Sequence, residues 1–484
     1  MRATIGSDSW PTGRHLIAPL AMHHHQPDVL QNLRQEFSNG RMWLDRTVVL
    51  AYAAMAGLSV VSFTFLTNHA FAWFERVYHW QGGWAVLLWT PAWAAAIVWA
   101  TRRFAPTAAG SGIPQVIAAL DPTISAAERP HFVSLRLTAA KMVLGAAGFL
   151  AGMSVGREGP SVQIAAGVMQ HARRWLGPHS GISEHALLVA GGAAGIAAAF
   201  NAPLAGVLFA IEELSRKLES RSSGLIITGI VLAGLIGVSF FGNRSYYGVI
   251  VVPELDWNAL APGLMVVLAC GALGGLFAKV MAASLTGAPE RLNHLRARFP
   301  VRFAAAGGLA IAVIGLVTGG ATFGAGSEAV QHMLAGEAEM PQLYVTLKFI
   351  ATWLTAWCGV PGGIFAPSLS IGAGVGHNVS LLMGADIAPA LIAMGMAAFL
   401  AAVTQAPLTA FIIVMEMIDG HALVLSLMAA AMLASLISRL IARPLYEILA
   451  LHMVAVLKTP PVAPSPVPPA PLEPPAAPVD AAQR

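Results

Sequence analysis

The sequence predicts an all-α polytopic membrane protein that is built from two similar halves. Hydrophobic residues make up 56% of the 484 residues and charged residues only 11%, and the mean hydropathy is +0.66. A soluble globular domain carries about 25% charged residues, so the composition excludes a soluble enzyme with an apolar core. Two further observations support this class: short stretches recur in both halves, and glycine and proline interrupt apolar runs at matching places.

Apolar stretches follow one another through the first half of the chain, and several are long enough to cross a bilayer. Residues 1–45 are polar and basic, so we expect a cytoplasmic N-terminal segment. Aromatic residues between positions 71 and 84 are typical of the outer membrane interface. The predicted helices cover 48–67, 84–101, 115–120, 135–154, 161–168, 186–200, a helix that opens at Pro203, and 225–241.

The second half continues in the same way and ends in a tail. The arginine-rich stretch 291–302 predicts a cytoplasmic loop. Residues 459–484 are rich in proline and alanine and cannot bury a core, so we expect a disordered tail. The transmembrane domain is placed at 46–458, with halves at about 46–245 and 255–442. The predicted helices cover 260–283, 303–318, 343–360, 388–402, 423–441 and a last short helix near Pro444.

No cofactor or metal site is expected. Cys270 and Cys358 lie in apolar runs, which argues against a disulfide framework and against a thiolate metal site. The run His23–His25 has no Cys or carboxylate at ligand spacing, so a solvated loop is the preferred interpretation. The basic residues lie in short loops, which indicates membrane orientation rather than nucleic-acid binding. An enzyme is not expected either, because no HExxH or GxSxG motif stands on a plausible element.

Matching stretches in the two halves reveal an internal repeat. Halves with glycine- and proline-interrupted helices in corresponding places indicate a transport site at the repeat interface. Helix N-termini that converge there carry partial positive charge and select an anion. The loop charges leave open whether the halves are inverted or parallel. The matches are 160–168 with 367–375, 201–205 with 405–409, and Glu212 with Glu416, each nine residues after its proline.

A charged pair lies inside an apolar run, in the stretch Gly156-Arg157-Glu158-Gly159-Pro160. Gly159 leaves room for close approach, and Pro160 suits the first turn of a helix. An ionisable residue at membrane depth is by default functional. We interpret Glu158 as a carboxylate that fills the anion site at this helix start and leaves it when protonated. The alternative is an interfacial glutamate that caps a surface helix.

Two further stretches break apolar runs with glycine and proline. The first is Gly110-Ser111-Gly112-Ile113-Pro114, which precedes a helix too short to span the bilayer. The second is 359–367, which contains Gly363-Ile364-Phe365-Ala366-Pro367. Irregular backbone at membrane depth is tolerated only where it lines a cavity or is buried in protein. For the first stretch, an ordinary cytoplasmic loop remains the alternative.

Together these three stretches resemble the signature sequences of the CLC family of chloride channels and chloride/proton antiporters, and Tyr446 matches a late tyrosine of that family. The resemblance covers about residues 45–455. It implies an inverted repeat of many tilted, partly re-entrant helices, and a homodimer with one pore per subunit. It also implies a bacterial inner membrane location with both termini cytoplasmic. The chain resembles the prokaryotic type without C-terminal regulatory domains, so we expect no adenine-nucleotide control.

The resemblance further implies roles for individual residues. The anion is expected to meet the hydroxyls of Ser111 and Tyr446 and the backbone N–H groups of Ile364 and Phe365. Neutral donors suit permeation, because a fixed Lys or Arg would hold chloride too tightly for turnover. Glu158 would be the outer gate and Glu213 the inner proton-transfer residue, although the residues alone also allow a solvated helix end at Glu213. The supporting motif residues are Gly110, Gly112, Pro114, Gly156, Arg157, Gly159, Pro160, Gly363 and Pro367.

The predicted function is chloride transport across the membrane by secondary active chloride/proton exchange gated by Glu158, and the alternative is a passive chloride-selective channel of the same fold. The family's fluoride members depart from the Ser and Tyr positions, and nitrate selectivity goes with proline at the Ser111 position. This chain keeps both Ser111 and Tyr446. The expected partners are chloride, protons, the lipid bilayer and a second copy of the chain, with no cofactor and no nucleic acid.

Overall fold

The computed structural model describes residues 40–459, except 178–179, 216–222, 243–245, 249–256, 337–339 and 384–386. The chain divides into a unit of residues 1–44 and a unit of residues 45–484. Only residues 40–44 of the first unit are described, so the predicted polar N-terminal segment with His23–His25 lies outside the described residues. The predicted tail lies outside them too, apart from its first residue.

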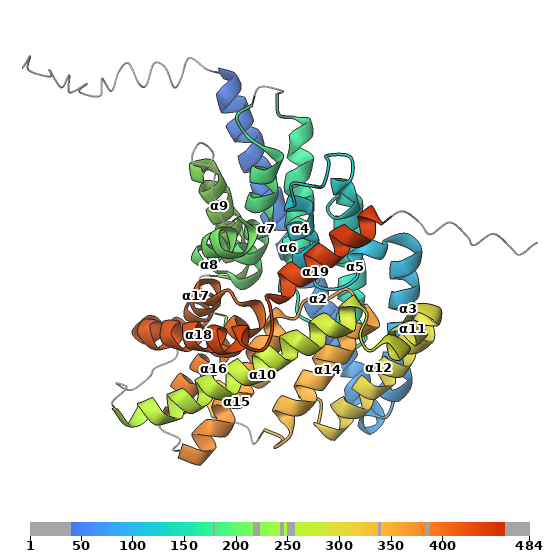
Figure 1. Ribbon diagram of the computed structural model, residues 1–484, viewed down its shortest axis with the longest axis vertical. Helices are drawn as coiled ribbons and strands as arrows, with labels where there is room; N and C mark the ends of the chain where they lie inside the picture. The colour runs from blue at the N-terminus through green and yellow to red at the C-terminus, as the bar shows by residue number, and fades with distance from the viewer. Residues whose placement is uncertain are drawn as a thin grey trace, which may run out of the picture. The chain divides into compact units, whose positions relative to one another are not determined.

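Helices make up most of the described chain (Figure 1), and the described residues contain no β-strand. The first half follows the predicted order, but its first helix is longer than the predicted span 48–67 and continues through the aromatic residues up to Tyr78. The reason is local: no glycine or proline interrupts positions 58–81. The helices are α2 (Gly40–His79), α3 (Val86–Phe104), α4 (Ile113–Leu120), α5 (Leu135–Leu150), α6 (Glu158–His171), α7 (Glu184–Phe200), α8 (Pro203–Phe209) and α9 (Ser223–Phe241).

The second half departs from prediction at two places. The predicted loop 291–302 is wrong, because α11 occupies most of it, with Glu290 in its first turn and basic residues in its last turn, as the helix dipole favours. Helix α13 was not predicted, whereas α15 and α17 were indicated only by the repeat matches at 367–375 and 405–409. The helices are α10 (Leu260–Thr286), α11 (Glu290–Arg298), α12 (Pro300–Val317), α13 (Ser327–Ala335), α14 (Tyr344–Cys358), α15 (Phe365–Met383), α16 (Ala388–Thr404), α17 (Pro407–Ile418), α18 (Val424–Arg439) and α19 (Leu445–Lys458).

Six helical stretches of the described chain are long and apolar enough to cross a membrane, so this is an integral multi-pass membrane protein. Several other apolar helices are shorter and lie buried between them. Helices α6 and α7 pack closely because small residues face each other: a Cβ on Gly195 would come 2.5 Å from the Ser161 carbonyl oxygen. Helices α15 and α16 pack in the same way through Gly372 and Gly395.

The two halves are related by a local two-fold axis. Gly156 and Gly363 occupy equivalent positions of the repeat, 207 residues apart. The N–H of each donates to the carbonyl of the other at 2.7 Å in an antiparallel bridge. Equivalent residues can exchange such bonds reciprocally only around a two-fold axis between them. The halves are therefore related by a two-fold rotation about an axis that passes through this bridge.

Two buried lysines repeat the same symmetry. Lys141 donates from Nζ to the carbonyls of Ala108 and Gly110, at 2.8 and 2.6 Å. Lys348 lies 207 residues later and donates to the carbonyls of Thr322 and Gly324, both at 2.9 Å. Each ammonium group therefore holds the loop before a short helix, α4 in the first half and α13 in the second.

The repeated glutamates cap each other's half. Glu416 accepts from the N–H groups of Leu204 and Ala205, at 3.3 and 2.7 Å, at the start of α8. In return Glu212 accepts from the N–H groups at the start of α17, at 3.0 and 2.6 Å. A carboxylate at a helix N-terminus satisfies donors that have no acceptor within the helix. The matching spacing in the sequence thus marks a reciprocal contact between the halves.

Removal of one cap should destabilise the protein. Glu416→Ala leaves two N–H groups of α8 without an acceptor, and we expect a loss of about 1–2 kcal/mol in unfolding free energy. Glu416→Gln keeps one amide oxygen and should lose less. The measurement is the thermal unfolding midpoint in detergent, with Glu290→Ala on exposed α11 as the control. Equal midpoints for wild type and Glu416→Ala would contradict the capping role.

Candidate functional site

The three glycine-rich stretches meet at one place. The Gly156–Gly363 bridge joins the second stretch to the third, and the Gly362 N–H donates to the Gly110 carbonyl at 3.1 Å, which joins the third to the first. Gly112, at φ +114°, approaches so closely that a Cβ there would come 2.5 Å from the Gly159 carbonyl oxygen. The first turns of α4, α6 and α15 therefore lie together, and each offers N–H groups without intrahelical acceptors.

A cavity of about 150 Å³ lies where α4, α15 and α19 meet, and Ser111, Ile364 and Tyr446 all line it. The hydroxyl oxygens of Ser111 and Tyr446 are buried, lie near each other, and have no hydrogen-bond partner. Phe365 does not line the cavity but begins α15, and its ring stacks on Tyr446 at 6.1 Å between centroids. A buried hydroxyl without a hydrogen-bond partner costs free energy, unless a bound ligand supplies that partner.

Glu158 lies at the start of α6 and is only 1% exposed, so it is no surface cap. Neither carboxylate oxygen has a hydrogen-bond partner at normal geometry, although the backbone of Arg157, Glu158 itself and Ala366 faces it. The carboxylate thus sits against the N-terminal ends of α6 and α15, where a free anion would also be stabilised. A Cβ on Gly156 would collide with it, which explains the glycine there.

Arg157 does not form an ion pair with Glu158 among the described salt bridges. Its guanidinium donates instead to Asn68 of α2 at 2.9 Å and to the Tyr246 hydroxyl at 3.1 Å, and it lies over the Tyr246 ring. The Glu158 carboxylate therefore lies against helix ends without a direct ion pair, although the Arg157 charge reaches it. A group held in this way can be exchanged for another anion.

Glu213 lies in a π-helical turn, Ala210–Leu214, that extends α8. Its neighbour Glu212 is committed to α17, whereas Glu213 lies within electrostatic reach of Tyr446. Glu158 also lies within electrostatic reach of Tyr446. The basic residues that follow Glu213 in the sequence, Arg216, Lys217 and Arg221, lie outside the described residues. The structure therefore brings Glu158, Tyr446 and Glu213 into one region.

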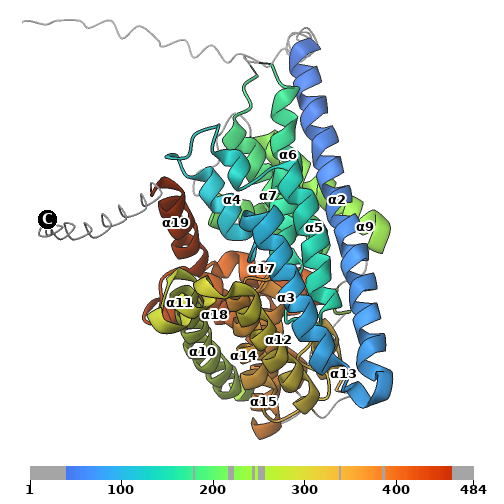
Figure 2. The same ribbon diagram turned by 90° about the vertical axis from the view of Figure 1, so that its right-hand side faces the viewer.

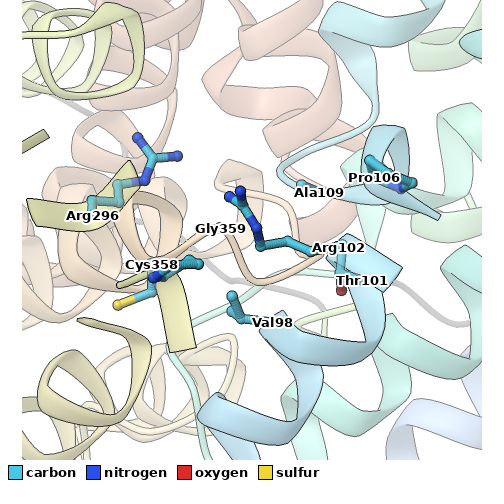
Figure 3. A pocket seen from close by; sticks show the side chains of 9 residues that line it. Val98, Thr101, Arg102, Pro106, Ala109, Arg296, Cys358 and Gly359 are labelled. Carbon is cyan, nitrogen blue, oxygen red and sulfur yellow. The ribbon is translucent and has the colours of Figure 1, made fainter. Parts of the chain in front are cut away.

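A second cavity, of about 300 Å³, adjoins the first, because Ala109, Arg296 and Gly359 line both. Figure 3 shows Arg102 reaching from α3 toward Gly359, with Arg296 of α11 on the other side of that loop. Burial lowers the pKa of Arg296 from its usual value, yet an arginine remains charged at neutral pH. A cavity lined by two guanidinium groups concentrates anions at the approach to the Ser111–Tyr446 cavity.

The sequence prediction missed these arginines as cavity residues and missed the role of Lys141. Lys141 is a charge within the apolar predicted helix 135–154, and its ammonium group holds the carbonyl of Gly110, directly before Ser111. A usable signal existed, because Lys348 stands at the equivalent repeat position. Since both ammonium groups are committed to backbone carbonyls, neither is a direct ligand for an anion in the cavity.

Comparison with known proteins agrees with this architecture. Residues 93–439 match the family model described as voltage gated chloride channel. The H(+)/Cl(-) exchange transporter ClcA of Vibrio parahaemolyticus is 31% identical over 384 residues, which cover 74% of this chain and 79% of that protein. The protein of the same name from Cronobacter sakazakii is 30% identical over 414 residues, which cover 81% of this chain and 86% of that protein.

Among solved structures, a slow cyanobacterial Cl⁻/H⁺ antiporter matches with a TM-score of 0.73 at 24% identity, covering 85% of this chain and 98% of its own. That likeness concerns the fold alone. It supports the predicted CLC-type inverted repeat, which the loop charges had left open, and agrees with the two-fold axis and the meeting of three interrupted helices described above. Since the family model and the sequence relatives each extend over most of the chain, and the signature stretches meet at one site, the chain belongs to the CLC family of voltage gated chloride channels.

Proposed function

We propose that the protein exchanges chloride for protons across the membrane, with Glu158 as the group that couples the two. The observation that carries this proposal is a buried carboxylate without a hydrogen-bond partner at the ends of α6 and α15, beside two buried hydroxyls that also lack partners. Its curated relatives are H(+)/Cl(-) exchange transporters, which favours exchange over a passive channel.

The coupling follows from competition for one position. Chloride in the cavity would be held by the hydroxyls of Ser111 and Tyr446 and by the N–H groups of Ile364 and Phe365, which are weak and neutral donors. The Glu158 carboxylate occupies the next anion position along the path. A proton neutralises it, it leaves, and chloride takes its place. Glu213, beside Tyr446, would pass protons to and from the cytoplasmic side.

The test is reconstitution into liposomes with chloride and pH electrodes in the same chamber. A chloride gradient imposed on the wild-type protein should drive protons against their own gradient, at a fixed ratio of chloride to protons. A passive channel would let chloride pass and move no protons uphill. Uphill proton movement therefore decides between the proposed function and its alternative.

The anion preference should depend on Ser111. Ser111→Pro removes the hydroxyl donor from the cavity and stiffens the backbone before α4, so compact chloride loses more stabilisation than the larger nitrate, and the ratio of nitrate to chloride flux should rise severalfold. Ser111→Ala, which removes the hydroxyl alone, should give a smaller change. The measurement is the flux of each anion from loaded liposomes. An unchanged ratio in Ser111→Pro would remove Ser111 from the anion site.

We further propose a homodimer with one pore per subunit, in a bacterial inner membrane with both termini cytoplasmic. Helices α9 and α18 expose large apolar side chains, such as Leu235 at 51% and Leu436 at 59%. The partly exposed carboxylates of Glu212 and Glu416 lie near this face, and lipid would be a poor environment for them. A second copy of the chain would cover both the exposed apolar side chains and these two carboxylates. Chemical crosslinking in liposomes should yield a dimer.

A further inference from the structure

Tyr247 follows the last helix of the first half and was not singled out in the sequence. It is only 8% exposed, and its hydroxyl has no hydrogen-bond partner. Its backbone N–H donates to the Met417 carbonyl at 2.8 Å, and its ring packs edge-on against Tyr246 at 4.9 Å. The ring is thus held in place, whereas its hydroxyl lacks a hydrogen-bond partner. Leaving a buried hydroxyl without such a partner costs free energy.

The surroundings of this hydroxyl lie on the outer side of Glu158. Tyr247 lies within electrostatic reach of the Glu158 carboxylate and next to Ser327, the first residue of α13. Figure 2 shows α13 beside the C-terminal end of α2, whereas α4 and α19 lie toward the other end. The loop before α13 agrees with this, because a Cβ on Gly324 would come 2.6 Å from the Phe71 ring of α2.

The repeat explains why a tyrosine stands there. The inner cavity combines the first residues of α15 with a tyrosine that follows the last spanning helix of the second half, Tyr446. The residues equivalent to Ile364 and Phe365 are Arg157 and Glu158, 207 positions earlier. Tyr247 follows the last spanning helix of the first half. In the order of elements along the chain, Tyr247 thus corresponds to Tyr446, and Glu158 to Phe365.

We propose that Tyr247 is the outer hydrogen-bond partner of Glu158. When the Glu158 carboxyl group leaves the anion path, it turns toward the Tyr247 hydroxyl, with Ser327 beside it, and this contact holds it there while chloride passes. The inference rests on the exchange function proposed above and makes Tyr247 a positioning residue for the coupling group. It pairs two buried groups that each lack a partner in the present arrangement.

Other charged and titratable groups surround the pair. Arg157 and Tyr446 face Glu158, and Tyr246 and Tyr344 face Tyr247. Around α13, Lys348 binds the preceding loop, and Glu328 lies within electrostatic reach of Glu75. Arg157 donates to the Tyr246 hydroxyl, which in turn lies 3.2 Å from Ser327 Oγ, so its charge is already engaged. The hydroxyls of Tyr247 and Tyr446 are the groups among them that lack a hydrogen-bond partner, and Tyr247, beside Ser327, is the one on the outer side of Glu158.

Tyr247→Phe tests the inference because it removes one hydroxyl and keeps the ring. We expect coupled exchange to persist at a rate about threefold to tenfold lower, and its half-maximal pH to move about 0.5–1 unit lower. The half-maximal pH falls because the protonated, displaced form of Glu158 loses a hydrogen-bond partner. A lower pH is then needed to populate that form. Tyr78→Phe is the matched control, since Tyr78 packs against Phe74 and Phe323 on the same side of the membrane and should behave as wild type.

A double variant separates an effect on Glu158 from an effect on the anion. In the Glu158→Ala background no carboxyl group remains to be held, so adding Tyr247→Phe should leave the chloride flux unchanged. A structure of Glu158→Gln, which mimics the protonated form, should place the amide beside the Tyr247 hydroxyl. An unshifted pH profile in Tyr247→Phe, or a flux loss that persists without the carboxyl group, would overturn the inference.

The two proposals fail in different ways. If the wild-type protein moved no protons uphill, the exchange function itself would be wrong. If the wild type exchanged normally and Tyr247→Phe kept its pH profile, the function would stand and only the role of Tyr247 would fall.

Discussion

Glu158→Ala is expected to let chloride pass while proton movement falls to the level of protein-free liposomes. The change removes the one carboxylate that lies buried at the ends of α6 and α15. Without it no proton is needed to clear the path, so chloride flux should also become independent of pH. The vacated position should bind an additional anion, because the N–H groups that faced the carboxylate remain.

Two measurements check this result. Paired chloride and pH electrodes report the loss of coupling, and a structure of Glu158→Ala in bromide should show an extra anion at the former carboxylate position. Glu328→Ala, an exposed glutamate on α13, serves as the control and should keep coupled exchange. Intact, pH-sensitive exchange in Glu158→Ala would be incompatible with the mechanism.

Glu213→Gln should stop proton movement without closing the chloride path. An amide cannot carry a proton, but it occupies the same space in the turn Ala210–Leu214, so the cavity at Tyr446 is preserved. Chloride flux in liposomes should continue at the same order of magnitude, and a chloride gradient should no longer drive protons uphill.

The adjacent residue supplies a matched control for this prediction. Glu212→Gln makes the same chemical change one position earlier, but Glu212 binds the start of α17 and not the cavity. It should keep proton coupling and lower the thermal unfolding midpoint instead. If proton pumping survived in Glu213→Gln, Glu213 would be a surface helix end, which was the alternative interpretation of the sequence.

Much of the fold was predictable because apolar runs and helix-breaking residues are local signals. The short helix α4 and the break before α15 follow from Gly110, Gly112 and Pro367 in this way. Helix α13 escaped prediction because it is only nine residues long. Helix α11 escaped prediction because its polar, charged sequence resembles that of a loop. Neither carries the apolar length on which the prediction of spans depends.

The site was predictable only in part, because its partners are distant in sequence. The three glycine-rich stretches were found, but their hydrogen bonds to one another depend on the folded chain. The equal spacing of Glu212 and Glu416 was visible, whereas the helix that each one caps was not. Tyr247 carries no local motif, and its proximity to Glu158 appears only after the halves are placed around their two-fold axis.

The bridge between Gly156 and Gly363 restricts how this transporter can move. Many transporters expose their site alternately by rocking one repeat against the other as rigid bodies. Here the two halves are joined beside the site by main-chain hydrogen bonds: two of 2.7 Å between Gly156 and Gly363, and a third from Gly362 to Gly110. Rocking that kept these bonds intact could only turn about an axis that passes through them. A large relative rotation would break these main-chain bonds, and Gly156, Gly362 and Gly363 are buried, so the loss would be costly. The moving barrier to chloride is therefore expected to be a single side chain, that of Glu158. Spin labels on the two halves should report nearly constant distances throughout the transport cycle.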